Sequence, residues 1–260
     1  MELEILKAGE ASDKPPLLFV HGSYCGAWIW AEHFLPYFAQ AGWQCLAVSL
    51  SGHGLSEGGD RLDAFGLGDY MVDVAKAVEG LGRPPVVIGH SLGGMVAQRF
   101  ACRNSVAGLV MLASVGPAGL GSAFTHMALR HPDLLWQLGR LQTVGPEGVD
   151  FEVMRRKMFS DDFPVDLAGK YVPLFQRESQ QAANELLLPQ WFNLMPRPSI
   201  PALVLGGDED AFIPYSDLAL AATYWGAEMT VLHAVPHVMM LDTTWERTAS
   251  TMLDWLGDRF

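Results

Sequence analysis

The chain has 260 residues, of which 50% are hydrophobic and 18% charged, so it can bury a substantial core and is not a disordered chain. Its formal net charge of -12 argues against binding to nucleic acid or to an anionic membrane surface. No run reaches the roughly 18 apolar residues of a membrane span, and the acidic N-terminus is unlike a secretory signal. We therefore expect a soluble, cytoplasmic protein. Its cysteines lack metal-ligand spacing and are expected to be reduced thiols: Cys25, Cys45 and Cys102.

Short apolar runs alternate with segments of helical spacing between residues 17 and 113. A short apolar run between turn residues is typical of a strand in a parallel sheet, and apolar spacings of three and four are typical of a helix. The alternation predicts an α/β fold with a mostly parallel sheet covered by helices on both faces. The expected strands are 3–6, 17–20, 45–50, 86–88 and 109–113, and the expected helices lie around 30–38, 67–81 and 95–100.

The alternation stops after residue 115 and resumes at residue 199. The intervening stretch has no convincing strand pattern, and prolines separate or kink its helical segments. We therefore predict an α/β core formed by residues 1–115 and 199–260, with a helical cap inserted over residues 116–198. The helices expected in the cap are 123–141, 149–159, 167–177 and 182–191.

The last part of the chain restores the strand and helix pattern. A helix is expected to begin at Pro214 and to end at Gly226, a residue favoured just past helix C-termini. Thr243-x-x-Glu246 has the pattern of a capping box and predicts the start of a final helix. The expected strands are 201–207 and 228–233.

The sequence Gly89-His90-Ser91-Leu92-Gly93 lies between an expected buried strand and an expected helix. In that setting Gly-x-Ser-x-Gly forms a tight, strained turn that holds the serine hydroxyl above the sheet, and the glycines remove side chains that would collide. The helix N-terminus behind the serine favours a developing negative charge. A Gly/Ser-rich turn is the alternative, but the flanking elements favour a nucleophile.

A serine nucleophile needs a base and an acid group that orients the base. In an open parallel sheet these groups come from loops at the carboxyl ends of strands. Two such loops follow Ser91: one contains Asp208, Glu209 and Asp210, and the other contains His237. A charged turn and a structural loop histidine are the alternatives, but the order serine, acid, histidine favours catalysis.

With these motifs the chain resembles the α/β-hydrolase family over nearly its whole length outside residues 116–198. The segment Gly207-x-x-Asp210-x-x-x-Pro214 is similar to the family's acid loop, which assigns the acid to Asp210 rather than Asp208.

Three other loops carry the resemblance, two of them with departures. His21-Gly22 looks like the family's oxyanion loop. Ser49 begins a segment similar to the family's Asp-x-x-Gly-x-Gly-x-Ser loop, in which it replaces the usual Asp. Pro236-His237 replaces the more frequent Gly-His.

The resemblance implies an ester hydrolase that works through an acyl-enzyme and uses no cofactor or metal. Ser91 would attack the ester carbonyl, and His237 would accept its proton and return it to the leaving alcohol. Asp210 would orient the imidazole. The backbone N–H groups of Ser23 and Leu92 would bind the oxyanion.

Within the family, residues 21–30 and 236–241 look most like the small carboxylesterases of the methylesterase and hydroxynitrile-lyase branch. Lyase members carry Lys after the histidine, where this chain has Val238, so lyase chemistry is disfavoured. A serine nucleophile in place of Asp likewise disfavours epoxide hydrolysis.

The expected substrate is a small or medium, largely apolar ester held beneath the cap. Alternatives are the same triad used for C–C bond, thioester or lactone hydrolysis or for cofactor-free perhydrolysis, and a hydrolase-like ligand receptor. The residues expected to line the pocket or to pack the cap are Phe124, Leu134, Leu135, Trp136, Phe159, Tyr171, Phe175, Leu187 and Trp191.

Overall fold

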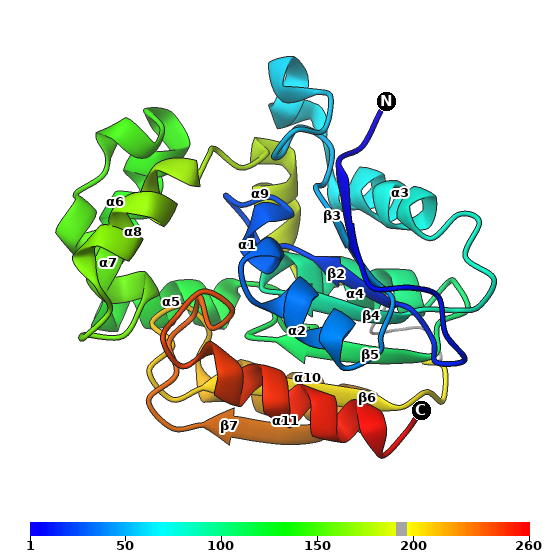
Figure 1. Ribbon diagram of the computed structural model, residues 1–260. Coiled ribbons are helices and arrows are strands. Elements are labelled where there is room, and N and C mark those ends of the chain that lie inside the picture. Colours follow the sequence, from blue (N-terminus) through cyan, green and yellow to red (C-terminus); the bar gives the residue numbers. More distant parts are fainter. Residues whose placement is uncertain (191–196) are drawn as a thin grey trace.

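The computed structural model describes residues 1–190 and 197–260, and these residues form one seven-stranded sheet (Figure 1). Its order is β1-β3-β2-β4-β5-β6-β7, with β1 antiparallel to β3 and the other neighbours parallel. The mostly parallel sheet predicted from the sequence is confirmed. The strands are β1 (Ile5–Ala8), β2 (Leu17–Val20), β3 (Cys45–Val48), β4 (Val86–His90), β5 (Gly108–Leu112), β6 (Ala202–Gly207) and β7 (Glu228–Leu232).

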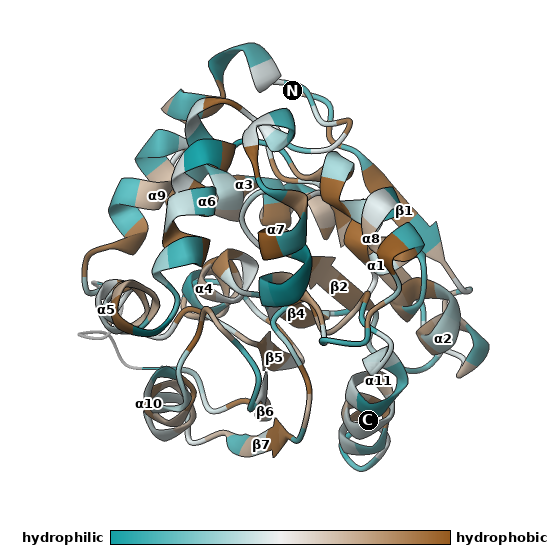
Figure 2. Cartoon of the chain, turned by 90° about the vertical axis from the view of Figure 1, so that its left-hand side faces the viewer, coloured by the Kyte–Doolittle hydropathy of each residue, from teal (hydrophilic) through white to brown (hydrophobic). Residues whose placement is uncertain are grey.

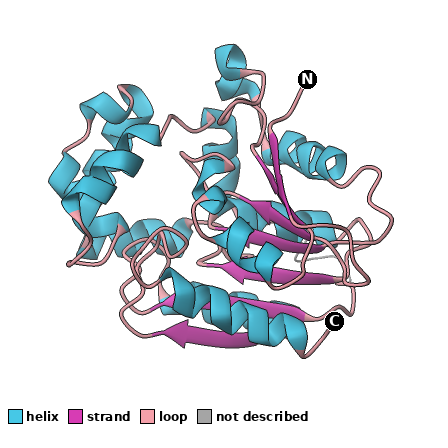
Figure 3. Ribbon diagram, viewed as in Figure 1, coloured by secondary structure: helices cyan, strands magenta, loops and turns pink. Residues whose placement is uncertain are grey.

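Helices cover both faces of this sheet, as the cyan and magenta elements of Figure 3 show. In Figure 2, α2 and α11 lie on one side of the strands, and α4 and α10 lie on the other. Within the described ranges, no helix is both long and apolar enough to cross a membrane. The helices against the sheet are α1 (Trp28–Ala31), α2 (Phe34–Gln40), α3 (Leu67–Ala77), α4 (Leu92–Ala101), α10 (Tyr215–Trp225) and α11 (Trp245–Gly257), and the 3-10 helix η1 (Gly59–Ala64) precedes α3.

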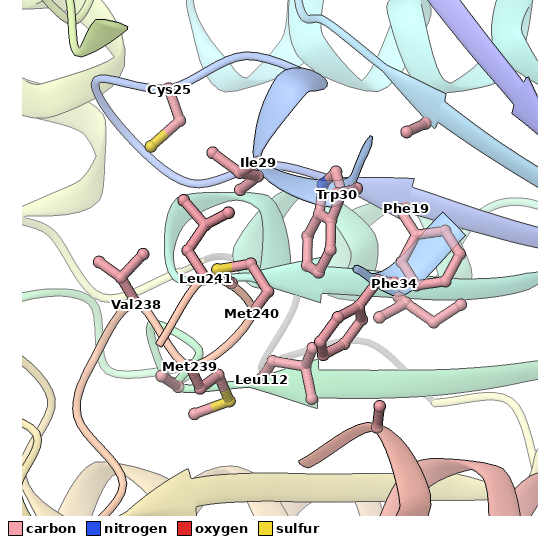
Figure 4. Packing of buried hydrophobic residues seen from close by; sticks show 14 of the residues in the cluster. Phe19, Cys25, Ile29, Trp30, Phe34, Leu112, Val238, Met239, Met240 and Leu241 are labelled. Carbon is pink, nitrogen blue, oxygen red and sulfur yellow. The ribbon is translucent and has the colours of Figure 1, made fainter. Parts of the chain in front are cut away.

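Alternate residues of each strand pack into separate cores on the two faces. In β2, Phe19 faces the core beneath α1, α2 and α11, whereas Leu18 faces the core beneath α3, α4 and α10. The centroid of the Phe19 ring lies 5.1 Å from the centroid of the Trp30 ring and 6.3 Å from that of the Phe34 ring (Figure 4). A strand buried on both faces is apolar at every position, which explains why these strands were recognisable in the sequence.

Between β5 and β6 the described residues form helices joined by turns and loops, and in Figure 1 α5 to α8 lie beyond the arrowheads of β5 and β7. The segment expected to be helical over 123–141 is helical, and Pro132 divides it, in line with the expectation that prolines separate or kink these segments. It is broken at His131, which has non-helical φ −137° and ψ 55°, because Pro132 disfavours helical backbone before it and starts a new helix. The elements here are α5 (Gly121–Arg130), α6 (Pro132–Thr143), η2 (Pro146–Gly148), α7 (Phe151–Met158), α8 (Val165–Tyr171), η3 (Val172–Leu174) and α9 (Gln180–Leu186).

Of the two C-terminal helices, one ends where the sequence predicts and the other does not begin as predicted. Helix α10 ends at Gly226, whose φ of 61° is left-handed, as expected. The capping box expected at Thr243 and Glu246 is wrong. Helix α11 begins one residue later, after Thr244, and the carboxylate of Asp242 accepts the backbone N–H of Thr244 at 3.0 Å. A buried Asp therefore fixes the turn that leads into the helix.

The turn between β4 and α4 holds Ser91 at φ 52° and ψ −117°, a conformation that costs a non-glycine residue about 1–3 kcal/mol. Hydrogen bonds to the end of β5 hold the turn: Ser91 N–H donates to Leu112 at 3.0 Å, and Val115 N–H donates to Ser91 at 3.1 Å. Helix α4 also rests directly on the end of β2, since a Cβ on Gly93 would lie 2.3 Å from the carbonyl oxygen of His21.

We expect Gly93→Ala to lower the free energy of unfolding by about 1–3 kcal/mol, because the added methyl group forces packed backbone apart. Gly68→Ala is the matched control. Gly68 is also the second residue of its helix, but a Cβ there meets nothing within 4 Å. The control should hold or slightly raise stability, since Ala favours helix over Gly. Urea unfolding followed by circular dichroism measures both, and equal stabilities would contradict the close packing.

Candidate active site

The expected acid and base form a buried pair at the carboxyl ends of β6 and β7. Nδ1 of His237 donates a hydrogen bond to Oδ2 of Asp210 at 2.8 Å, and the two side chains are 5% and 1% exposed. The other oxygen, Oδ1, accepts the backbone N–H groups of Phe212 at 2.7 Å and Ile213 at 3.0 Å. The loop after β6 thus orients the carboxylate, and the carboxylate fixes the imidazole with Nε2 as the nitrogen left for chemistry.

Asp208 forms a second Asp–His pair, but on the surface. Its Oδ2 lies 2.7 Å from Nδ1 of His233, whose side chain is 87% exposed. The hydrogen bond from His233 holds the pKa of Asp208 below its usual value. The structure therefore brings Asp210, and not Asp208, to His237.

The loop that carries His237 is held from two sides. Below it, residues 238–241 are buried and pack into the core beneath α1 and α2 (Figure 4). Beside it, Oδ2 of Asp242 accepts both the N–H and the hydroxyl of Ser160, each at 2.8 Å. Because Ser160 follows α7, the inserted helices are tied to the loop of the candidate base.

His90 supports His237 from the turn beside Ser91. Its Nε2 donates a hydrogen bond to the backbone carbonyl of His237 at 3.0 Å, and the two ring centroids are 4.7 Å apart. Burial, together with the charge of His237, lowers the pKa of His90 well below its usual value. A neutral His90 therefore adds no like charge when His237 takes up a proton.

Ser23 and Leu92, the expected oxyanion donors, come from two loops at the carboxyl edge of the sheet. Leu92 is the first residue of α4, and Ser23 lines the candidate cavity after the end of β2. His21 holds the second loop, because its Nδ1 donates to the carbonyl of Gly22 at 2.8 Å and its Nε2 accepts the N–H of Leu50 at 3.0 Å. Burial lowers the pKa of His21 to about 3, consistent with a neutral, structural residue.

The departure at Ser49 is compensated by a residue outside the loop. The Ser49 hydroxyl accepts the N–H of Ala27 at 2.8 Å and donates to Oε2 of Glu4 at 2.5 Å. The same Oε2 accepts the N–H of Leu55 at 3.0 Å. The carboxylate of Glu4, from the N-terminal segment, therefore accepts hydrogen bonds from this loop, in which the family usually has an Asp. No local sequence motif indicated this contact.

A cavity of about 450 Å³ contains Ser91 and His237 on its wall. Most other lining residues are apolar, and many come from the inserted helices. They include Phe124, Met127, Leu135, Leu138, Met158, Phe175, Leu186, Leu187, Phe212 and Met240. Such a surface favours apolar ligand groups next to the serine.

The sequence identified part of this lining. Phe124, Leu135, Phe175 and Leu187 line the cavity as expected. Three of the others pack as expected and do not line the cavity, because helical spacing shows which face is apolar but not what that face contacts. Leu134, Phe159 and Tyr171 are buried in packing between elements, Trp136 is 68% exposed, and Trp191 lies outside the described residues.

Glu178 is a lining residue that the sequence analysis missed. It is 1% exposed and lies between η3 and α9. It accepts a hydrogen bond from Tyr70, which is 108 residues away in the chain, and it lies 3.4 Å from His53. Since these contacts form only in the folded chain, no local signal could have identified it.

All three cysteines are free, as expected. Cys25 lines the cavity, so it is the one to consider as a rival nucleophile. Burial, followed by the charge of Glu178, raises the pKa of Cys25 above its usual value. A protonated thiol is a poor nucleophile, which leaves Ser91 as the candidate.

Residues 17–251 match the model of the Alpha/beta hydrolase family. The chain belongs to the α/β-hydrolase family. This hydrolase is 34% identical over 92 residues to Epoxide hydrolase 1 of Caenorhabditis elegans, a match that covers 35% of this chain and 22% of that one. It is 25% identical over 268 residues to the Non-heme chloroperoxidase of Streptomyces lividans, covering 88% and 87% of the two chains. The solved esterase from Exiguobacterium antarcticum superposes with a TM-score of 0.80 at 16% identity over 98% and 95% of the two chains, so the two share a fold.

We expect Asp210→Asn to lower the hydrolase's kcat on an activated ester by about 10³–10⁴-fold, because an amide no longer holds the working tautomer of His237. Asp208→Asn is the matched control, since it makes the same change in the exposed pair and should alter kcat by less than about threefold. Steady-state kinetics on both variants make the comparison. A larger loss from Asp208→Asn than from Asp210→Asn would contradict the assignment.

Proposed function

We propose that this α/β-hydrolase cleaves small or medium, largely apolar carboxylic esters through an acyl-enzyme. One observation carries the proposal: the buried pair of His237 and Asp210 and the strained Ser91 meet at one largely apolar cavity. The esterase from Exiguobacterium antarcticum, which shares the fold, is consistent with it.

In the proposed reaction, Ser91 Oγ attacks the ester carbonyl while Nε2 of His237 takes the hydroxyl proton. Asp210 stabilises the imidazolium, and the N–H groups of Leu92 and Ser23 bind the oxyanion. The imidazolium then protonates the leaving alcohol, and a water activated by His237 releases the acid. No hydrogen bond joins Ser91 to His237 among the described residues; such contacts often tighten only when substrate binds.

The same proposal assigns residues 116–198 as a cap over the site. Its helices supply apolar lining such as Phe124 on α5 and Leu138 on α6. A cavity of about 450 Å³ lies within the range of small-molecule sites and suits a short or medium chain. Closing such a site removes bulk water and strengthens its electrostatic contacts.

A second candidate is cofactor-free perhydrolysis. It is favoured by the likeness, at 25% identity over most of both chains, to a protein named Non-heme chloroperoxidase. In this reaction hydrogen peroxide attacks the same acyl-enzyme in place of water. The acyl group is transferred to the peroxide, and the product released is a peracid. Supplying peroxide to the purified protein and assaying peracid separates the two activities.

We expect the hydrolase to turn over a series of p-nitrophenyl acyl esters, with Ser91→Ala reducing kcat/KM at least 10³-fold because the nucleophile is lost. Ser105→Ala is the matched control, since Ser105 is exposed and lies in the turn after α4. Its kcat/KM should match the wild type within about twofold. Release of p-nitrophenolate is the measurement, and the preferred acyl length reports the depth of the cavity.

Two outcomes would count against the proposal. Retained turnover in Ser91→Ala would exclude Ser91 as nucleophile. No turnover of any ester by the wild-type protein would exclude simple ester hydrolysis and favour thioester, C–C or lactone substrates or ligand binding.

A further inference from the structure

The exposed residues of the cavity wall mark where the cavity meets solvent. Helices α5, α6 and α9 and the residue after α9 supply them, whereas lining residues beneath α1, such as Ile29 and Met240, are fully buried. We call these exposed lining residues the mouth of the cavity: Phe124, Gly139, Gln180, Asn184 and Leu187. A bound ester therefore has one end in a closed, apolar part of the cavity and the other end at this mouth.

Helix α6 turns one face toward the cavity. Its lining residues are Leu135, Leu138, Gly139 and Gln142. Their spacings of three and four place them on the same side of the helix. Gly139 lies in the middle of this face, with lining residues on the turn before it and the turn after it. A side chain at position 139 would therefore point into the cavity.

The space in front of Gly139 is open. A Cβ on Gly139 would meet no atom of the described residues within 4 Å. Gly139 is an interior residue of α6 and has no positive φ, so neither left-handed backbone nor a close contact requires glycine here. Glycine weakens a helix interior relative to alanine. The missing side chain is thus unfavourable for the helix, and its effect on the cavity is extra width at the mouth.

The order of the proposed reaction assigns the alcohol part of the ester to this mouth. In an acyl-enzyme mechanism the alcohol leaves first, while the acyl group is still bonded to Ser91. The alcohol must then reach solvent, and water must enter behind it. The mouth is also the more polar end, because the amides of Gln180 and Asn184 line it and bond to each other at 3.2 Å. The apolar acyl group fits the closed end.

We propose that Gly139 is a specificity-determining residue whose missing side chain makes room for the alcohol part of the ester. The substrate class is then an ester of an apolar carboxylic acid with a broad alcohol, one that carries a ring or a branch. This inference rests on the ester hydrolysis proposed above and names its substrate more narrowly.

The test compares a broad ester with a slim ester of equal carbon number, separately for the two parts of the substrate. The alcohol pair is cyclohexyl butyrate and hexyl butyrate. The acyl pair is ethyl cyclohexanecarboxylate and ethyl heptanoate. Titration of the released acid at constant pH gives kcat/KM, and the readout is the ratio of broad to slim within each pair. Because both esters meet the same preparation, the ratio does not depend on how much of a variant is folded.

We expect the wild-type protein to hydrolyse cyclohexyl butyrate with a kcat/KM within about tenfold of that for hexyl butyrate. Gly139→Leu should lower the ratio of the alcohol pair by about tenfold or more, because leucine fills the space that the ring needs. Gly139→Ala should lower it less. The ratio of the acyl pair should change by less than about threefold in both variants, because the acyl group lies away from the mouth.

Gly169→Leu is the matched control. Gly169 is an interior glycine of α8 whose Cβ would likewise meet no described atom within 4 Å, but it does not line the cavity. This variant should keep the wild-type ratio in both pairs.

Three results would overturn the inference: an unchanged alcohol ratio in Gly139→Leu, a fall in the acyl ratio alone, or a wild-type protein that hydrolyses hexyl but not cyclohexyl butyrate. Any of them, with Ser91-dependent hydrolysis of the slim esters, leaves the proposed function standing. No turnover of any ester overturns both.

Discussion

The candidate site depends on how closely the backbone of α4 approaches the end of β2. Gly93 allows this contact, since a Cβ there would collide with the carbonyl oxygen of His21. The approach brings the loop of Ser23 beside Leu92, the first residue of α4, so the two expected oxyanion donors come from adjoining segments. The same turn holds Ser91 at positive φ. One packing constraint in the backbone therefore positions both the candidate nucleophile and the groups expected to stabilise its product.

The inserted helices are joined to the core by hydrogen bonds at two separate loops. On one side, the N–H of Val238, next to the candidate base, donates to the carbonyl of Met158 at 3.1 Å. On the other, Gln176 accepts the N–H of Gly54 and donates to the carbonyl of Gly52, each at 2.9 Å. The inserted helices are therefore bonded directly to the loop of the candidate base and to the loop after β3.

The electrostatics of the site combine groups kept neutral with groups kept charged. His21 and His90 are fully enclosed, and burial holds the pKa of each low, so they act as neutral hydrogen-bonding groups beside the reacting ones. The pKa of His53 is raised and the pKa of Glu178 is lowered, because the charge of each partner outweighs the effect of burial on the other. The pKa shifts of these buried residues therefore follow their surroundings rather than their residue type, since His21 and His53 shift in opposite directions.

The sequence alone determined the parallel sheet and the serine turn, because both depend on local apolar runs and turn residues. The order of the candidate residues and the resemblance to the family's acid loop led to the proposal of Asp210 and His237. The capping box expected at Thr243 and Glu246 did not form, because Asp242, which is held by tertiary contacts with Ser160, fixes the turn before the helix and the helix begins after Thr244. Only the tertiary structure could identify the contacts of Glu4 and Glu178. Their partners lie far away in the chain, so the chemistry of both carboxylates exists only after folding brings those partners together.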